Sequence, residues 1–356
     1  MRESTCRREL AGGRGRGKPG GFPTLALRAE SERRAGVIVR WGLGQLPDVL
    51  GELGIAQPLL VASERWAQLG LGVRTAGRWT EVPSEQVGEV AAHAGDGILA
   101  LGGGSAIDLG KAASAEAGVP VVSVPTTYAG AEWTSFFGIR DPERRMRGGG
   151  SGAHLGGVVY DPELTFSLPR AETVGTALNA LAHSAEALYV EGHNAQADEH
   201  ALTGAALIGQ WLPRVVESPQ GLEERRKLLK GAMHAGMALG GSMLGLGHAM
   251  GQALGGRYGL PHGAMNALTL PAALRFNAEV VPEAVGRFGQ ALGADDPAGR
   301  VEELARLGGF ERLRDFGIPE ADLPEVAAAT VERAGAKANP RAASAAEVEQ
   351  LLRSIY

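Results

Sequence analysis

The first half of the chain alternates between short apolar runs and segments with the periodicity of a helix. Five runs are rich in β-branched and other apolar residues: Val37–Arg40, Pro58–Ser63, Gly97–Leu101, Val119–Val124 and Gly157–Tyr160. Short apolar strands with helices between them are typical of a parallel sheet that helices cover on both sides. We therefore expect residues 36–169 to form an α/β, Rossmann-like domain of the kind that binds nucleotides.

A different pattern interrupts this domain between Phe136 and Gly150. Two short runs of mixed polar and apolar residues flank Asp141-Pro142-Glu143-Arg144. Residues of these types favour a turn. We expect the segment to leave the sheet as a hairpin.

After Pro169 the β-branched runs stop, and Ala- and Leu-rich segments with a 3.6-residue period take over. These segments are Thr173–Val190, Asp198–Val216, Leu222–Met243, Glu283–Leu292, Val301–Leu307 and Ala345–Ile355. Prolines punctuate them, at Pro213, Pro219, Pro261, Pro282 and Pro319. Residues 170–356 are therefore predicted to form an all-helical domain, and the seam near Pro169 is where a ligand cleft is expected.

Composition narrows the classes of partner. The chain has 356 residues, 44% of them hydrophobic, and a net charge of −5. The length is typical of about two domains. The negative net charge would not attract nucleic acid or an anionic membrane. No run approaches the ~20 apolar residues of a membrane-spanning helix. We expect no nucleic-acid or membrane partner and a cytoplasmic location.

The N-terminal segment and the single cysteine add two exclusions. Met1–Gly21 is basic and Gly-rich and lacks the apolar central run of a secretory signal. We expect residues 1–35 to form a disordered tail, with contact to an acidic partner as the alternative. Cys6 is the only cysteine, which excludes a disulfide framework and a catalytic or zinc-binding cysteine in the core.

Three consecutive glycines mark the first candidate binding loop. Gly102, Gly103, Gly104 and Ser105 follow the run Gly97–Leu101 and open a helical segment that contains Asp108. Glycines let backbone N–H groups approach an anion closely, and the start of a helix adds partial positive charge. This loop, with Asp108, is predicted to bind the diphosphate of a nucleotide, although a tight turn without a ligand has the same local pattern. Its spacing is not G-x-G-x-x-G.

Two more strand ends carry candidate cofactor contacts. Thr126, Thr127 and Tyr128 follow the run Val119–Val124, and their hydroxyls suit phosphate or ribose, or an ordinary Thr-rich turn. Ser63 stands where NAD-specific dehydrogenases commonly place an acid that binds the ribose. Because Ser63 would not repel a 2′-phosphate, NADPH is allowed beside NADH, and Glu64 leaves the choice open.

Four polar residues are candidates for the reacting centre. Asn179 and His183 are spaced to share one face of a helix, while His248 and His262 lie fourteen residues apart in a Gly-rich segment. Three imidazoles and an amide in an otherwise apolar context can converge on a metal ion or a reacting group. The alternative for each histidine alone is a structural role.

Taken together, these residues resemble the iron-containing alcohol dehydrogenase superfamily, and within it the maleylacetate reductase branch. That resemblance implies a dehydroquinate synthase-like fold, with an N-terminal nucleotide domain and a C-terminal helical domain. The matching segments are Gly102–Ser105, Pro125–Glu132, Tyr160–Thr165, Leu178–His183 with Glu186–Tyr189, Leu260–His262 and Ala338–Arg341.

The resemblance assigns roles and also exposes departures. In the alcohol dehydrogenases the position of Asn179 is an Asp that, with three histidines, holds a divalent metal. An amide is a weaker ligand than a carboxylate, so Fe²⁺ or Zn²⁺ on Asn179, His183, His248 and His262 is possible, but its absence is the stronger expectation. Gln252 stands where relatives carry a histidine, and Gln does not exchange a proton near pH 7. The five residues after His262 look like the alcohol dehydrogenase pattern.

The function implied is NAD(P)H-dependent reduction of an activated alkene or carbonyl in a small carboxylated substrate, by a homodimer. His183, His248 and His262, with Asn179 and Gln252, are the candidate catalytic residues, and Arg257 is the cation nearest in sequence for a carboxylate. Two alternatives stay open: a metal-dependent alcohol or aldehyde dehydrogenase, and a non-redox lyase, cyclase or scaffold that retained the fold.

Overall fold

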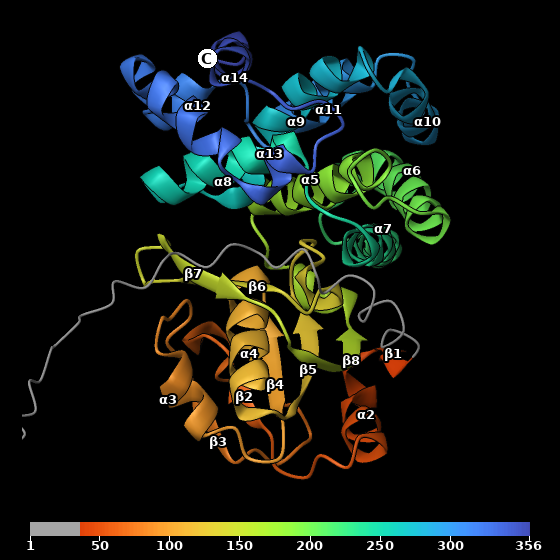
Figure 1. The fold of residues 1–356 in the computed structure, drawn as a ribbon. Helices are drawn as coiled ribbons and strands as arrows, with labels where there is room; N and C mark the ends of the chain where they lie inside the picture. Colours follow the sequence, from red (N-terminus) through yellow and green to blue (C-terminus); the bar gives the residue numbers. More distant parts are fainter. Residues whose placement is uncertain (1–35) are drawn as a thin grey trace, which may run out of the picture.

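A computed structural model describes residues 36–356, so the prediction for residues 1–35 lies outside the described part of the chain. Figure 1 shows two lobes, a sheet flanked by helices and a layer of helices above the carboxyl ends of the strands. The expected fold class is thereby confirmed. The last strand of the sheet ends at Tyr160, and the first long helix of the second lobe begins at Arg170.

The sheet has six parallel strands in the order β1-β8-β5-β4-β2-β3. They are β1 (Ile38–Trp41), β2 (Leu59–Val61), β3 (Gly77–Trp79), β4 (Ile98–Gly102), β5 (Pro120–Pro125) and β8 (His154–Tyr160). All five expected strands are present. The sixth, β3, was not foreseen because its three residues Gly-Arg-Trp are only half-buried at the sheet edge and form no apolar run.

Alternation of side chains along the strands builds two cores, one on each face of the sheet. Leu60, Leu99 and Val122 pack against α2 (Leu46–Glu52). Their neighbours Leu59, Ile98 and Val121 pack on the other face. There α3 (Val87–Ala92) and α4 (Gly104–Ala117) cover the sheet. Burial on both faces is the physical reason for the continuous apolar runs.

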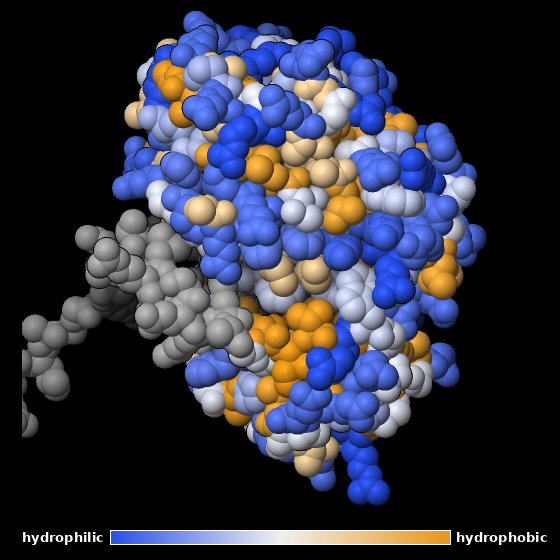
Figure 2. Space-filling view, turned by 90° about the vertical axis from the view of Figure 1, so that its right-hand side faces the viewer, coloured by the Kyte–Doolittle hydropathy of each residue, from blue (hydrophilic) through white to orange (hydrophobic). Residues whose placement is uncertain are grey.

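Among the described strands, the edge strand β1 hydrogen-bonds to β8 alone, and all four of its residues are partly exposed. Figure 2 shows this side of the molecule, where apolar side chains gather just below the junction of the two lobes. The expected hairpin lies outside this sheet and is formed by β6 (Phe137–Arg140) and β7 (Met146–Gly150). In Figure 1 it lies between the two lobes.

The second lobe is helical. Its helices are α5 (Arg170–Ala187), α6 (Ala195–Glu217), α7 (Leu222–Gly241), α8 (Leu246–Tyr258), α9 (His262–Ala278), α10 (Pro282–Leu292), α11 (Pro297–Arg306), α12 (Leu323–Val331), α13 (Ala334–Lys337) and α14 (Ala345–Ser354). The punctuation by proline was wrong at Pro213, which lies inside α6. Helix α9 was not foreseen because it is buried on nearly all sides and therefore shows no amphipathic period. Within residues 36–356, no helix has the length and apolarity to cross a membrane.

Candidate functional site

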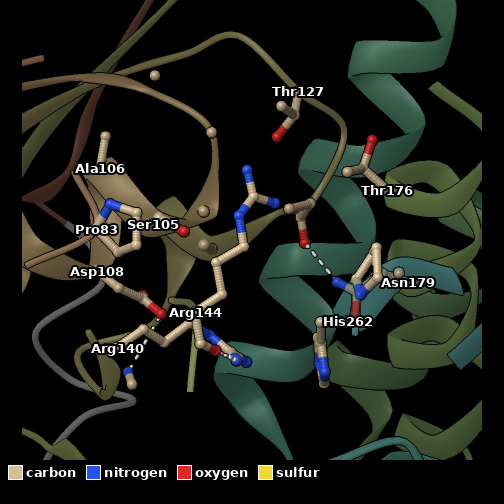
Figure 3. Close-up of a pocket in the computed structure, with 18 of the residues that line it drawn as sticks. Pro83, Ser105, Ala106, Asp108, Thr127, Arg140, Arg144, Thr176, Asn179 and His262 are labelled. Carbon is tan, nitrogen blue, oxygen red and sulfur yellow. Dashed lines mark hydrogen bonds between the residues drawn. The ribbon is translucent and has the colours of Figure 1, made fainter. Parts of the chain in front are cut away.

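A cavity of about 670 Å³ lies between the two lobes. The end of β4, the loop after β5 and the β6–β7 hairpin form one side of it, and helices α5, α8 and α9 form the other. Figure 3 shows Ser105, Asp108 and Thr127 on the sheet side and Asn179 and His262 on the helical side. The sequence-predicted residues that line it are Ser63, Gly102, Gly103, Gly104, Ser105, Asp108, Thr126, Thr127, Asn179, His183, His248, Gln252 and His262.

The glycine loop is built for close approach of a ligand to the backbone. Gly102 has a φ of +150°, which disfavours a side chain, and a Cβ on Gly103 would lie 2.8 Å from Cγ2 of Thr127. No side chain caps the N-terminus of α4 at Gly103. The first N–H groups of this 14-residue helix therefore remain available to an anion, as the sequence predicted.

A buried lysine, which the sequence did not single out, fixes the next turn of α4. Lys111 donates to the carbonyl oxygens of Ala131 and Phe136, each at 2.7 Å, and lies 2.8 Å from Oδ1 of Asp108. Oδ2 of Asp108 accepts the N–H of Gly138 at 3.2 Å. Asp108 thus lies in the cavity wall with both oxygens engaged, and it joins α4 to the hairpin.

The loop after β5 contributes two threonines to the cavity but not its tyrosine. Thr126 donates its N–H to the carbonyl of Gly102 at 3.0 Å, which holds the two loops together. Tyr128 is fully buried outside the cavity, where its hydroxyl accepts from Arg225 at 2.9 Å and donates to Thr165 at 3.1 Å. Sequence reasoning placed Tyr128 among the cofactor contacts, whereas its side chain supports the loop from behind.

The three predicted histidines form one cluster. The ring centroids of His183 and His248 are 4.7 Å apart with nearly parallel planes, and those of His248 and His262 are 5.9 Å apart. They come from α5, α8 and the first residue of α9. Gln252 lies one turn after His248 on α8 and also lines the cavity.

Glu186, fully buried on α5, orients His248. Its Oε2 accepts from Nδ1 of His248 and from the N–H of Gly245, each at 2.6 Å, and its Oε1 accepts the N–H of His248 at 3.0 Å. Nδ1 of His248 therefore carries a proton, and Nε2 is buried without a hydrogen-bond partner. A carboxylate behind an imidazole fixes both its tautomer and its ring orientation.

An amide chain orients the other two rings. Asn179 donates one Nδ2 hydrogen to the carbonyl of Ala129 at 3.1 Å, and its Nδ2 is 3.3 Å from Nε2 of His183. Its Oδ1 accepts from Nδ2 of Asn266 at 2.6 Å, and that nitrogen is 3.0 Å from Nε2 of His262. Because the Ala129 carbonyl can only accept, it sets the direction of the whole chain. Both imidazoles then accept at Nε2 and carry their proton at Nδ1, which has no partner in either.

This donor set does not fit a divalent metal. The amide chain occupies Nε2 of two histidines, Asn179 supplies no charge, and Glu186 is committed to His248. Among residues 36–356, no three or more His, Cys, Asp or Glu side chains are arranged to hold a metal ion. Divalent cations in such sites need free lone pairs and are held best with an anionic ligand.

Burial keeps two of the imidazoles neutral. The pKa of His183 is well below its usual value because the ring is desolvated, with smaller effects from His248, His262 and Lys111. The pKa of His262 is also well below its usual value, through desolvation and then the charges of His248, Arg140 and Arg333. At neutral pH these two rings are hydrogen-bond donors at Nδ1 and not proton carriers.

Arg257 lies outside the cavity. Its guanidinium is 2.7 Å from Glu325 and 3.3 Å from Asp322 on the surface of the helical lobe. Residues that sequence reasoning missed include Glu186, Asn266 and Lys111. A signal existed for Asn266, because it follows His262 at the same spacing that separates Asn179 from His183.

Comparisons with known proteins bear on the whole chain. Residues 37–155 match the family model described as iron-containing alcohol dehydrogenase, and residues 173–356 match that of the C-terminal domain of the Fe-containing alcohol dehydrogenase family. The maleylacetate reductase of Pseudomonas knackmussii is 34% identical over 329 residues, which cover 88% of this chain and 93% of that protein.

Solved structures agree. The iron-containing alcohol dehydrogenase of Corynebacterium glutamicum superposes with a TM-score of 0.80 at 30% identity, covering 90% of this chain and 94% of that one. The maleylacetate reductase of Rhizobium sp. also gives 0.80, at 27% identity, covering 90% and 96%.

Proposed function

Since the chain belongs to the iron-containing alcohol dehydrogenase family and is a nicotinamide-dependent oxidoreductase, we propose that it reduces maleylacetate or a close carboxylated analogue. One observation carries the proposal: a chain 34% identical to a maleylacetate reductase brings its glycine loop and its histidine cluster into one cavity. The relatives favour this over a metal-dependent alcohol dehydrogenase or a non-redox enzyme.

The residues present fit a nicotinamide cofactor. We assign the diphosphate to the free N–H groups of Gly104 and Ser105, with Gly103 kept small by Thr127. From there the cavity reaches Ser63 on one side and His262 on the other, which leaves room for the two ends of a dinucleotide. When bound, the reduced cofactor supplies a hydride to the substrate.

We assign two tasks to the histidine cluster: it stabilises the negative charge that forms on the substrate, and it delivers the proton. Hydride addition to an alkene conjugated with a carbonyl leaves negative charge on the carbonyl oxygen, and prepositioned donors stabilise such charge. The partnerless Nδ1–H groups of His183 and His262 are donors of this kind. We assign His248 to deliver the proton that completes the reduction: with its Nδ1–H held by Glu186, it would take up a second proton from solvent at Nε2 and pass that proton to carbon.

The choice between NADH and NADPH is assigned to Ser63 and its surroundings. Ser63 lines the cavity together with Arg65, and Arg78 donates to the Ser63 carbonyl at 3.0 Å. This end of the cavity carries cations and no acid in the position that binds a ribose diol, so we expect NADPH to be accepted as well as NADH. Ser63→Asp should weaken NADPH binding and leave NADH binding largely unchanged, and titration of cofactor fluorescence reads out both.

We also propose a homodimer. The partly exposed apolar strand β1 offers a free sheet edge, and a second copy would satisfy it. Light scattering coupled to gel filtration measures the mass directly. A cytoplasmic location stays a prediction.

The test of the proposed function is oxidation of NADH or NADPH in the presence of maleylacetate. The wild type should turn over without added metal, whereas His248→Ala and His262→Ala should each lower kcat. Unchanged turnover in both variants would refute the roles assigned to the cluster, and no turnover by the wild type would refute the substrate.

A further inference from the structure

Two arginines line the hairpin end of the cavity, and a third lies beside α8, outside the lining. Arg140 ends β6, Arg144 lies in the turn before β7, and both line the cavity. Figure 3 shows them on the side opposite Asn179 and His262. Arg333 directly precedes α13. A Cβ placed on Gly256 of α8 would lie 3.8 Å from Nη2 of Arg333 and 3.9 Å from Cβ of Met146 in the hairpin. Arg333 and the hairpin thus both lie near Gly256 of α8.

Arg140 and Arg333 are partly buried, and no carboxylate pairs with either of them within residues 36–356. Arg140 donates to the carbonyl of Arg144 at 3.0 Å, and the Nε of Arg333 is buried without a hydrogen-bond partner. In the described part of the chain, neither forms an ion pair with a carboxylate. The acid that acts on Arg140 is Asp108, and Lys111 already pairs with it. Arg257, by contrast, has two acidic partners.

Desolvation makes this arrangement costly in the free protein. It lowers the pKa of both Arg140 and Arg333 from the usual range, since burial disfavours the charged form. A buried charge without a partner destabilises the folded state, and an anion bound beside it removes that penalty. Arg140 lines the same cavity as His262, and the charges of both arginines contribute to lowering the pKa of His262.

We propose that Arg140 and Arg333 bind a carboxylate of the substrate next to His262. The inference rests on the proposed function and adds to it the residues that select a carboxylated substrate. A guanidinium offers two parallel N–H donors that match a carboxylate. The cavity then has two separate anion positions: backbone N–H groups at α4 for the cofactor, and side-chain guanidinium groups at the hairpin for the substrate.

The kinetic test compares charge-removing variants. Arg140→Gln and Arg333→Gln should each raise KM for maleylacetate by ~10- to 100-fold, the loss expected for a charge-assisted hydrogen bond. Their kcat should change much less, and the Kd for NADPH should stay within about twofold. Arg140→Lys should recover part of the affinity, which separates lost charge from a misfolded hairpin. Arg257→Gln removes the same charge outside the cavity and should match the wild type.

A binding measurement separates this inference from the proposed function. Titration calorimetry with maleate, a dicarboxylate that cannot be turned over to the same product, should show binding to the wild type and to Arg257→Gln, and weaker binding to Arg140→Gln and Arg333→Gln. Maleate binding by the two arginines without any maleylacetate turnover would refute the proposed function and keep the subsite. Turnover with KM unchanged in both variants, or equal maleate binding by all four proteins, would overturn the subsite.

Discussion

At the scale of single residues, hydrogen-bond partners decide what each histidine in the cluster can do. Glu186 gives His248 a counter-ion at Nδ1 and leaves Nε2 free, whereas Asn179 and Asn266 occupy Nε2 of the other two rings. We propose that chemically identical side chains thereby serve as one proton carrier and two neutral donors.

Glu186→Gln should lower kcat by ~10- to 100-fold with little effect on the Kd for the cofactor, because an amide cannot accept all three hydrogen bonds or balance a charge on His248. The pH profile of kcat should move as well, which a purely structural loss would not cause. Glu199→Gln, on the exposed face of α6, is the matched control. Wild-type kcat in Glu186→Gln would contradict the role of the dyad.

Asn179→Asp should create metal affinity. The carboxylate adds an anion to the cluster and removes the N–H that faces Nε2 of His183. Zn²⁺ binding should tighten by about tenfold or more relative to the wild type, since even a change outside the ligands can alter affinity this much. Elemental analysis after dialysis against Zn²⁺ measures it. Stoichiometric metal in the wild type, lost together with activity on chelation, would contradict the site described above.

Much of this site could be predicted from spacing alone. The interval from Asn179 to His183 is one helical turn, so their shared face follows from the sequence. The partners of these residues could not be predicted, because Glu186 reaches His248 across 62 positions and Asn266 reaches Asn179 across 87. Such pairings depend on how α5, α8 and α9 cross, which no local pattern encodes.

At the scale of elements, the junction of β4 with α4 is the position that we propose for the cofactor diphosphate. The strand ends at Gly102, the helix starts at Gly104, and Lys111, about two turns further, ties the helix to the hairpin. The order of strand, glycine loop and helix could be predicted from the sequence because each part has its own local pattern. Helix α9 was not, since burial all round removes the contrast between faces.

Gly103→Ala tests the glycine loop. Its Cβ would lie 2.8 Å from Thr127, and overpacking of this kind costs about 1–3 kcal/mol. The Kd for NADH or NADPH should rise by roughly 5- to 150-fold if that strain falls on the bound form. Gly51→Ala, in α2, meets no atom within 4 Å and should bind the cofactor normally. Equal affinities for the two variants would place the cofactor elsewhere.

At the scale of the whole molecule, three histidines of the helical lobe make the stability of the fold sensitive to acid. The pKa values of His183 and His262 are well below the usual value, and that of His234 is about 4. Below pH ~6.5 the unfolded chain binds protons at these residues while the folded chain does not, so the free energy of unfolding falls as pH falls. Each fully buried histidine lowers the free energy of unfolding by at most ~1.4 kcal/mol per pH unit in this range.

The melting temperature should therefore decline between pH 7 and pH 5. His234→Gln, at a residue that does not line the cavity, removes one of these groups and should make the decline shallower while leaving turnover unchanged. Scanning calorimetry across that range gives both slopes. A melting temperature that does not change between pH 7 and pH 5 would show that the histidines titrate normally in the fold.

The most direct measurement is single-turnover oxidation of bound NADPH by maleylacetate, compared between the wild type, Gly103→Ala and His248→Ala. If the glycine loop binds the cofactor and the histidine cluster acts in the reaction, Gly103→Ala should react at close to the wild-type rate once it is saturated with cofactor. His248→Ala should bind the cofactor normally and react slowly. A wild-type rate in His248→Ala, or normal NADPH affinity in Gly103→Ala, would contradict it.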